Sequence, residues 1–285
     1  MKIYFHISGR LGNQLFQWAF LHELISNGFE VQLFIDKYHN NIDTPQDLSK
    51  LLIECRHLPK IQTRNDLGFL LKCYEKLLSG GKLSQNIAKK LPVLIEEFPR
   101  VQNKKLSFVI IDGFFIDKQW PIKHKDELIR EIHKMQNFPE FQTSTSNSGI
   151  KIGSTTLHVR RGDYHNYKKT FGLLSSSYYL KLIEPREEAV VLTDSLKEVK
   201  GIFGNRKNLI FTDPSIIDPW QALYVMSKSK RLLMGNSTLS WWGGFLAFYT
   251  NNAEVVMPIP FYFQPSKFDS QLAVDGFKFE ESIFE

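Results

Sequence analysis

The sequence has few cysteines and no long apolar run. Its 285 residues include two cysteines, Cys55 and Cys73, which form neither a C-x-x-C pair nor a cluster with histidine. Two cysteines in a chain of this length are typical of a reducing compartment. No apolar run approaches the ~20 residues that span a bilayer, and residues 1–16 start as a strand rather than as a signal peptide. We therefore expect a cytoplasmic protein.

Several catalytic and metal-binding signatures are also missing. The sequence has no Asp-x-Asp pair, which would hold a divalent metal on a diphosphate, and neither G-x-S-x-G nor H-E-x-x-H. These absences argue against a serine hydrolase of the α/β type and against a zinc protease. They predict a site that uses neither a metal nor another cofactor.

The charge balance is basic, with a formal net charge of +6. Such an excess favours anionic partners, although an ordinary solvated basic surface is the better explanation of the net charge taken alone. No basic block with interleaved aromatic residues is present, so we do not expect nucleic-acid binding. Hydrophobic residues make up 42% of the chain and aromatic residues 13%, which is the composition of a globular protein with ample core.

The first half of the sequence begins with a βαβ pattern. Residues 2–7 resemble a buried strand, a helix follows from Asn13 to Ile25, and residues 29–35 alternate as a second strand. Asn13 can cap the helix, and Gly28 stands where it would stop. A βαβ unit implies a parallel sheet. Further on we expect amphipathic helices at 48–52, 67–78, 87–97 and 126–135 and a strand at 107–115.

The second half alternates regularly between strands and helices. It follows a polar segment, residues 142–154, which is the best linker candidate. Five alternations predict a doubly wound domain that binds ligands at the strand carboxyl ends. We therefore expect an α/β protein with two Rossmann-like domains that face a cleft. The predicted strands are 155–159, 189–193, 208–212, 231–235 and 254–258, and the predicted helices are 175–183, 195–203, 218–227 and 237–249.

Two adjacent arginines occur in the stretch 158-HVRRGD, at the end of a predicted strand. A guanidinium group matches phosphate oxygens bidentately, and burying two positive charges without an anion would be costly. We expect one of Arg160 and Arg161 to meet Asp163 or another acid and the other to meet an external anion. An exposed, ion-paired loop is an equally good interpretation of position alone.

A second block, 234-MGNSTLSWWGG, again runs from strand to helix. Asn236, Ser237 and Thr238 would stand at a helix N-terminus, which binds anions through free backbone N–H groups, and Ser240 adds a hydroxyl. The alternative is a simple helix cap with a tryptophan core. The glycine-rich loop Gly9–Asn13 is a weaker signal that permits close backbone approach. Together these features suit departure of a nucleoside diphosphate from a sugar carbon.

Three blocks carry a resemblance to a known family. The segments 9-GRLGNQLFQWAF, 158-HVRRGD and 235-GNSTLSWWGGFLA resemble glycosyltransferase family 11, the α-1,2-fucosyltransferases, in its bacterial form. The resemblance covers nearly the whole chain. It implies a GT-B-like fold, with residues 1–150 forming an acceptor-side domain with a helical insertion and residues 151–285 binding GDP-fucose.

The resemblance also implies the reaction and its partners. L-Fucose would pass from GDP-β-L-fucose to the 2-hydroxyl of a terminal β-galactoside, with inversion and without a metal. Bacterial members build surface glycans such as O-antigen on the cytoplasmic side. The basic charge of this chain would then suit peripheral contact with an anionic inner membrane face that carries a lipid-linked acceptor. Two alternatives remain: use of another GDP-hexose or linkage, and a non-catalytic nucleotide-sugar or glycan-binding protein.

Residue roles follow from the resemblance motif by motif. Arg161 would clamp the diphosphate, Arg160 would be a structural or secondary anion contact, and Asp163 would orient an arginine. His158 and Asp194 belong to donor-binding blocks. The donor block at the helix start comprises Asn236, Ser237, Thr238 and Ser240, and the N-terminal loop comprises Gly9, Arg10, Gly12 and Asn13, with Asn13 near the reacting sugar.

The general base is left open by two departures from the family pattern. Asp194 is followed by Ser195 where relatives often have a second acid, and residues 165–169 lack the acid of distant α-1,6 relatives. An inverting transfer needs a group within reach of the acceptor hydroxyl. Asp163 is the first candidate and His158 the second. A departing phosphate that takes the proton itself is the third.

Overall fold

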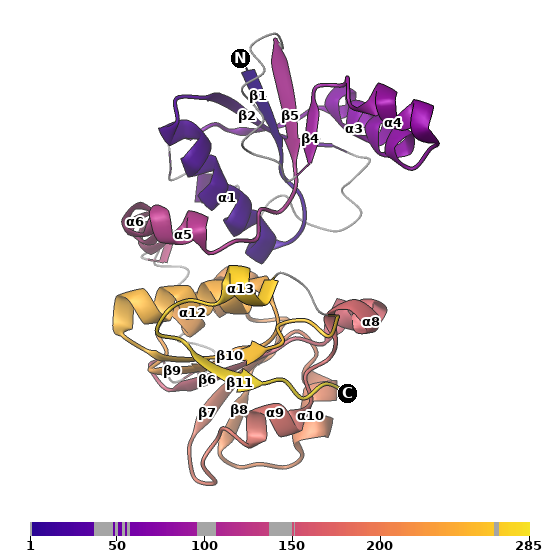
Figure 1. Cartoon of the computed structure of the whole chain (residues 1–285). Coiled ribbons are helices and arrows are strands. Elements are labelled where there is room, and N and C mark those ends of the chain that lie inside the picture. The colour runs from indigo at the N-terminus through magenta and orange to yellow at the C-terminus, as the bar shows by residue number, and fades with distance from the viewer. Residues whose placement is uncertain are drawn as a thin grey trace. The chain divides into compact units, whose positions relative to one another are not determined.

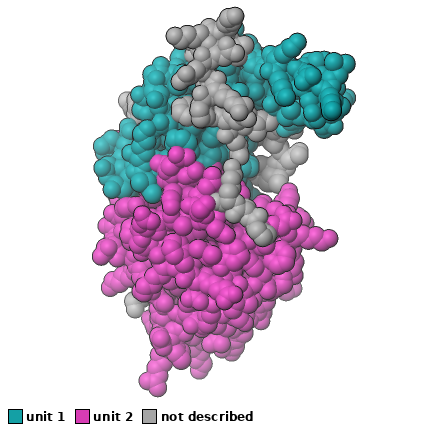
Figure 2. Space-filling view, in the orientation of Figure 1, with its two compact units in different colours: residues 1–115, 120–131 teal, residues 116–119, 132–285 magenta. Residues whose placement is uncertain are grey.

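A computed structural model describes residues 2–36, 48, 51–52, 55, 58–95, 107–136, 150, 152–264 and 268–285. The chain divides by its internal contacts into two compact units (Figure 2). Unit 1 comprises residues 1–115 and 120–131, and unit 2 comprises residues 116–119 and 132–285. The predicted linker, residues 142–154, lies largely outside the described residues. The domain boundary predicted at residue 150 stays a prediction.

Unit 1 is built on a parallel sheet of order β3-β2-β1-β5-β4 (Figure 1). Its strands are β1 (Lys2–His6), β2 (Glu30–Ile35), β3 (Ile61–Thr63), β4 (Val93–Ile95) and β5 (Phe108–Asp112). Its helices are α1 (Leu11–Ser26), α3 (Asn65–Leu78) and α4 (Lys82–Ala88), and the chain continues through α5 (Gln119–Lys123) and α6 (Lys125–Gln136).

Helices cover both faces of this sheet. Neighbouring residues of a strand point to opposite faces, so they contact different helices. On β1, Phe5 packs edge-to-face against Phe20 of α1. Its neighbour Tyr4 packs against the cluster that includes Leu67 and Leu71 of α3. Both faces of β1 are therefore covered, the one with Phe5 fully and the one with Tyr4 in part.

Unit 2 is a parallel sheet of order β11-β10-β9-β6-β7-β8. Its strands are β6 (Thr155–Val159), β7 (Ala189–Thr193), β8 (Leu209–Phe211), β9 (Arg231–Leu233), β10 (Glu254–Ile259) and β11 (Lys278–Glu281). Its helices are α8 (Lys168–Phe171), α9 (Ser176–Leu180), α10 (Leu196–Phe203), α11 (Pro219–Ser227), α12 (Thr238–Asn251) and α13 (Phe268–Leu272), with a 3₁₀ helix, η1, at Gly162–Tyr167.

The second sheet is also covered on both faces. Val256 of β10 lies in the core cluster formed with α9 and α10. Its neighbour Val255 faces α12, where a Cβ added to Gly244 would lie 2.9 Å from it. Trp241 and Trp242 of α12 are fully buried. They therefore belong to the core, as the alternative of a helix cap with a tryptophan core predicted.

The predicted fold class is confirmed, since both units are Rossmann-like parallel sheets covered by helices. The cleft predicted between the two domains stays a prediction. The strands predicted at 155–159 and 189–193 match β6 and β7 at both ends. Short edge strands such as β3 and β11 were not predicted.

Two local predictions are wrong. Asn13 does not cap the first helix, because α1 begins at Leu11 and its N-cap is Arg10. Residues 87–97 do not form one helix: α4 ends at Ala88 and β4 begins at Val93. Pro92 cannot continue a helix, and Val93 pairs with Ile110 of β5 instead. Of the helix predicted at 48–52, the structure describes residues 48 and 51–52, which are helical, and residues 49–50 lie outside the described residues.

Within the described part of the chain, none of the helices combines the length and the apolarity that a membrane span requires. The cytoplasmic location and the peripheral membrane contact stay predictions.

Candidate functional site

Both motif blocks of unit 2 lie at the carboxyl ends of adjacent parallel strands. The arginine turn, Arg160–Asp163, follows β6, and the second block begins at Met234, directly after β9 ends. β6 pairs with β9 on one side and with β7 on the other, so the strand order reverses at β6 and β9. Open α/β sheets bind their ligands at such a reversal. The two blocks therefore occupy the place where unit 2 is expected to hold a ligand.

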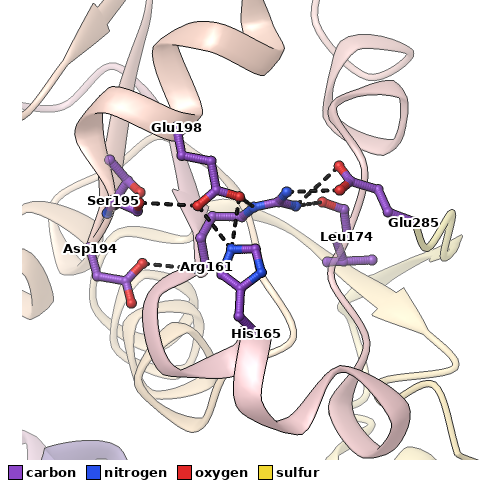
Figure 3. A network of polar contacts seen from close by, with 8 residues as sticks. Arg161, His165, Leu174, Asp194, Ser195, Glu198 and Glu285 are labelled. Carbon is purple, nitrogen blue, oxygen red and sulfur yellow. Dashed lines mark hydrogen bonds and ion pairs between the residues drawn. The ribbon is translucent and has the colours of Figure 1, made fainter.

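Arg161 is buried in a network of internal contacts (Figure 3). Its Nε donates to Glu198 Oε1 at 2.7 Å, and its Nη1 donates to the Leu174 carbonyl at 3.2 Å. The Glu285 carboxylate accepts from Nη1 at 3.1 Å and from Nη2 at 2.8 Å. These contacts use four of the five N–H groups of the guanidinium. Burial lowers the pKa of Arg161, but the carboxylates of Glu285 and Glu198 raise it above its ordinary value.

Glu198 is the common partner in this network. In addition to its contact with Arg161, Glu198 accepts a hydrogen bond from the Ser195 hydroxyl at 3.1 Å. His165 Nε2 lies 3.0 Å from Glu198 Oε1. Burial raises the pKa of Glu198, but contacts with His165, Arg161 and Ser195 outweigh burial and hold that pKa below its usual range. Glu198 therefore stays ionised and fixes both Arg161 and His165.

Arg160 contacts two different acids and is the more accessible arginine. Its Nη2 lies 2.5 Å from Asp163 Oδ1, and its Nη1 lies 2.9 Å from Asp194 Oδ2. These contacts account for two of its five N–H groups. Its side chain is 13% exposed, against 3% for Arg161. Arg160 thus keeps more donor capacity for a ligand, and the clamp role assigned to Arg161 stays a prediction.

Asp194 shapes the arginine turn. Its Oδ1 accepts from the Arg161 backbone N–H at 2.8 Å while its Oδ2 meets Arg160. A Cβ on Gly162 would lie 2.4 Å from Asp194 Oδ2. The glycine of the motif is therefore required because the carboxylate passes directly over it, and Asp194 acts here as an anchor of the turn.

His158 of β6 is buried, with 5% of its surface exposed. Burial, followed by the neighbouring Arg160, lowers the pKa of His158 to about 3. Its Nδ1 has no hydrogen-bond partner in the described part of the chain. The imidazole is therefore neutral at pH 7 and weakly basic, which makes it a poor general base.

The second block is joined to the arginine turn. The Asn236 side chain donates to the Phe171 carbonyl at 2.8 Å. The backbone carbonyl of Asn236 accepts from the Tyr164 hydroxyl, in η1, at 2.9 Å. Ser240 accepts from the Gly235 N–H at 2.9 Å. The side chains of Asn236 and Ser240 therefore stabilise the local backbone structure. Ser237 is the N-cap of α12 and makes no side-chain cap bond, and Thr238 is the first residue of the helix.

The N-terminal loop belongs to unit 1 and is held by glutamines of its own motif. Gly9 has φ +74°, and a Cβ there would lie 2.9 Å from Phe114. Gln14 donates to the Gly9 carbonyl at 2.7 Å. Gly9 and Arg10 are exposed, Gly12 is buried and Asn13 is half-buried. The structure therefore divides the predicted site residues between unit 1, with these four, and unit 2, with the rest.

Sequence reasoning missed Glu198 and Glu285, the two acids that hold Arg161. Glu198 lies four residues after Asp194 on α10, so a search for further acids beyond that aspartate would have found it. No feature of the sequence pointed to Glu285 as a partner of Arg161. No group of three or more His, Cys, Asp or Glu in the described ranges could hold a metal ion, and metal independence stays a prediction.

Comparison with known proteins gives two curated relatives and several distant structures. No family model matches the chain. It is 32% identical over 134 residues to the O-antigen biosynthesis glycosyltransferase WbnK of Escherichia coli, a match spanning 43% of this chain and 43% of WbnK. It is 26% identical over 281 residues to an α-1,2-colitosyltransferase of Escherichia coli, covering 90% of this chain and 91% of that protein.

Among solved structures, the NodZ α-1,6-fucosyltransferase soaked with GDP-fucose aligns with a TM-score of 0.47 at 11% identity, covering 86% of this chain and 92% of that one. The two curated relatives make the chain similar to glycosyltransferases. Membership of glycosyltransferase family 11 stays a prediction.

Proposed function

We propose that this chain is a glycosyltransferase that moves L-fucose from GDP-β-L-fucose to the 2-hydroxyl of a terminal β-galactoside, with inversion and without a metal. The observation that carries the proposal is the arginine turn beside the start of α12, at the strand-order reversal of unit 2. The full-length similarity to an α-1,2-colitosyltransferase supports it, since colitose is a fucose-like sugar. The partial similarity to WbnK supports an O-antigen acceptor.

In the proposed reaction, unit 2 must stabilise the diphosphate that leaves. When the bond between the sugar C1 and the β-phosphate oxygen breaks, negative charge develops on the phosphate, and fixed donors aimed at it lower the barrier. Arg160 has unused N–H groups and partial exposure, so we assign it the diphosphate contact. The N-terminal N–H groups of α12, with the Ser237 hydroxyl, supply further donors. Arg161 then stabilises the turn through its ion pairs with Glu198 and Glu285.

A matched pair of variants tests this division of roles. Arg160→Lys keeps the charge but loses the bidentate fork, so we expect kcat/KM to fall roughly 10- to 100-fold with an unchanged melting temperature. Arg161→Lys loses buried hydrogen bonds, so we expect about 1–3 kcal/mol less stability. Equal loss of stability in both variants, or full activity of Arg160→Lys, would contradict the assignment.

A second candidate function keeps the fold and changes the sugar. The relative that covers 90% of the chain is named a colitosyltransferase, so the alternative that we propose is GDP-colitose as the donor in place of GDP-fucose. Parallel initial-rate measurements with both donors, on the same acceptor, distinguish the two. A higher kcat/KM for GDP-colitose would replace the fucose assignment and leave the glycosyltransferase assignment standing.

A further inference from the structure

Helix α3 covers one face of the sheet in unit 1, and α4 packs against α3 (Figure 1). The inner side of α3 provides Leu67 and Leu71, which pack with Val93 and Ile110 of the sheet. The only buried residue of α4 is Ala88. The two helices are therefore fixed to unit 1 through the inner side of α3, and α4 contributes almost nothing to the core.

Both helices expose large apolar side chains. Leu83 and Ile87 of α4 are 77% and 47% exposed, and because they are four residues apart they are neighbours on one face of the helix. On α3, Phe69 and Leu78 are 57% and 38% exposed. A helix that packs against its own protein normally buries its apolar stripe. α4 does the reverse, since it buries an alanine and exposes a leucine and an isoleucine.

The same stretch of the chain is basic. Residues 65–90 contain five lysines and two acids, which gives a net charge of +3, half of the +6 of the whole chain. All five lysines are exposed. One of the two acids, Asp66, is paired with Arg64 at 2.7 Å. Residues 82–90 contain no acid and three lysines, which are Lys82, Lys89 and Lys90. The exposed apolar side chains of α4 therefore have positive charge at both ends of the helix.

Exposed apolar side chains among lysines indicate the kind of partner. Helices that lie on a membrane surface place aliphatic side chains at the boundary of headgroups and acyl chains, and their lysines meet anionic headgroups. A second copy of this chain fits the surface less well. In a two-fold dimer the same surface of both subunits meets, so lysines would face lysines. An anionic lipid surface satisfies both the apolar and the charged part of the helix.

We propose that α3 and α4 dock unit 1 on an anionic phospholipid surface. Leu83 and Ile87 enter the boundary between headgroups and acyl chains, and the three lysines of residues 82–90 contact the phosphate oxygens of the headgroups. All residues of this docking surface belong to unit 1. None of them is among the candidate site residues, so the proposal adds a binding surface to the proposed function and does not rest on it.

The two kinds of side chain make different contributions to binding. Each lysine close to an anionic bilayer strengthens binding roughly fivefold, and salt screens this contribution. The apolar side chains of Leu83 and Ile87 add a contribution that salt does not screen. Binding should therefore weaken as the salt concentration rises, and it should also depend on both apolar residues at every salt concentration.

The charge is tested by cosedimentation with vesicles of phosphatidylglycerol and phosphatidylcholine in equal parts, and with vesicles of phosphatidylcholine alone. We expect the wild type to bind the first kind much more strongly. Removing the three lysines of residues 82–90 should weaken that binding roughly 100-fold. A control with the same net charge loses three exposed lysines of unit 2 and should bind within a few-fold of the wild type. The two variants are Lys82→Gln, Lys89→Gln, Lys90→Gln and, as the control, Lys197→Gln, Lys200→Gln, Lys207→Gln.

The apolar part is tested with the double variant Leu83→Ser, Ile87→Ser on the same vesicles. We expect binding to weaken at least roughly tenfold while it stays sensitive to salt. Ile216→Ser is the control, because Ile216 is 57% exposed on unit 2 and lies outside the docking surface. Both variants should keep the circular dichroism of the wild type, since substitutions of exposed side chains change stability little.

Three results would overturn the proposal. The wild type could bind both kinds of vesicle equally or neither of them, or the variant without the three lysines of residues 82–90 could bind as the wild type does. Sedimentation equilibrium could also show a wild-type dimer that the double serine variant separates into monomers, which would assign the surface to a second copy of the chain. None of these measurements uses a sugar donor, so each result leaves the proposed function to be decided by its own assay.

Discussion

Deprotonating His6 should destabilise unit 1, and the size of the effect follows from the structure. The ordinary pKa of histidine, about 6.5, applies to the unfolded chain. In the folded chain burial lowers the pKa of His6, but the carboxylates of Asp112 and Asp36 outweigh burial and raise that pKa to about 9. A group whose folded pKa is raised stabilises the fold fully below its unfolded pKa and loses that contribution as the pH rises through the folded one. At 1.36 kcal/mol per unit, the loss between pH 6.5 and 9.5 is about 3 kcal/mol.

The assay compares urea unfolding of the wild type and of His6→Gln across this pH range. Subtracting the two free energies of unfolding removes the contributions of other titrating groups, because they are common to both chains. The difference should be largest in favour of the wild type near pH 6.5 and should shrink by about 3 kcal/mol by pH 9.5. A difference that stays constant with pH would refute the interpretation of His6 as a buried imidazolium.

Two further predictions concern the arginine turn. Gly162→Ala should abolish GDP binding measured by calorimetry with little change in circular dichroism, because the added Cβ would lie 2.4 Å from Asp194 Oδ2. Gly201→Ala is the control, since its added Cβ meets nothing within 4 Å, and equal GDP binding by both variants would contradict this account. Glu198→Gln should lower the unfolding free energy by about 1–3 kcal/mol in thermal melts, because Arg161 loses a charged partner, and an unchanged melting temperature would show that the network does not stabilise the fold.

Much of the fold could be predicted from the sequence, because parallel strands buried on both faces appear as continuous apolar runs. Residues 155–159 and 189–193 illustrate this, since every residue in both strands is buried. The failures have local causes. The three residues of β3 are too few to form a pattern, and the helix predicted at 87–97 overlooked the effect of Pro92 on the backbone.

The candidate site could be predicted only in part. Arg160 and Asp163 are three residues apart, so their contact is local and could be anticipated. Glu285 reaches Arg161 across 124 positions, and His6 meets Asp112 across 106. Such contacts depend on strand order and register, which a single sequence does not reveal. The identity of the residues at strand ends was visible, but their pairing was not.

The most direct test of the central claim is a single incubation of the wild-type chain with GDP-fucose, EDTA and a panel of β-galactosides that includes lactose and N-acetyllactosamine. Mass spectrometry detects the product and NMR assigns the new linkage. Our account predicts fucose on the galactose 2-hydroxyl, in the α configuration, formed at full rate in the presence of EDTA. Failure to bind GDP, in this mixture or by calorimetry, would contradict the assignment of the arginine turn as a nucleotide-sugar site.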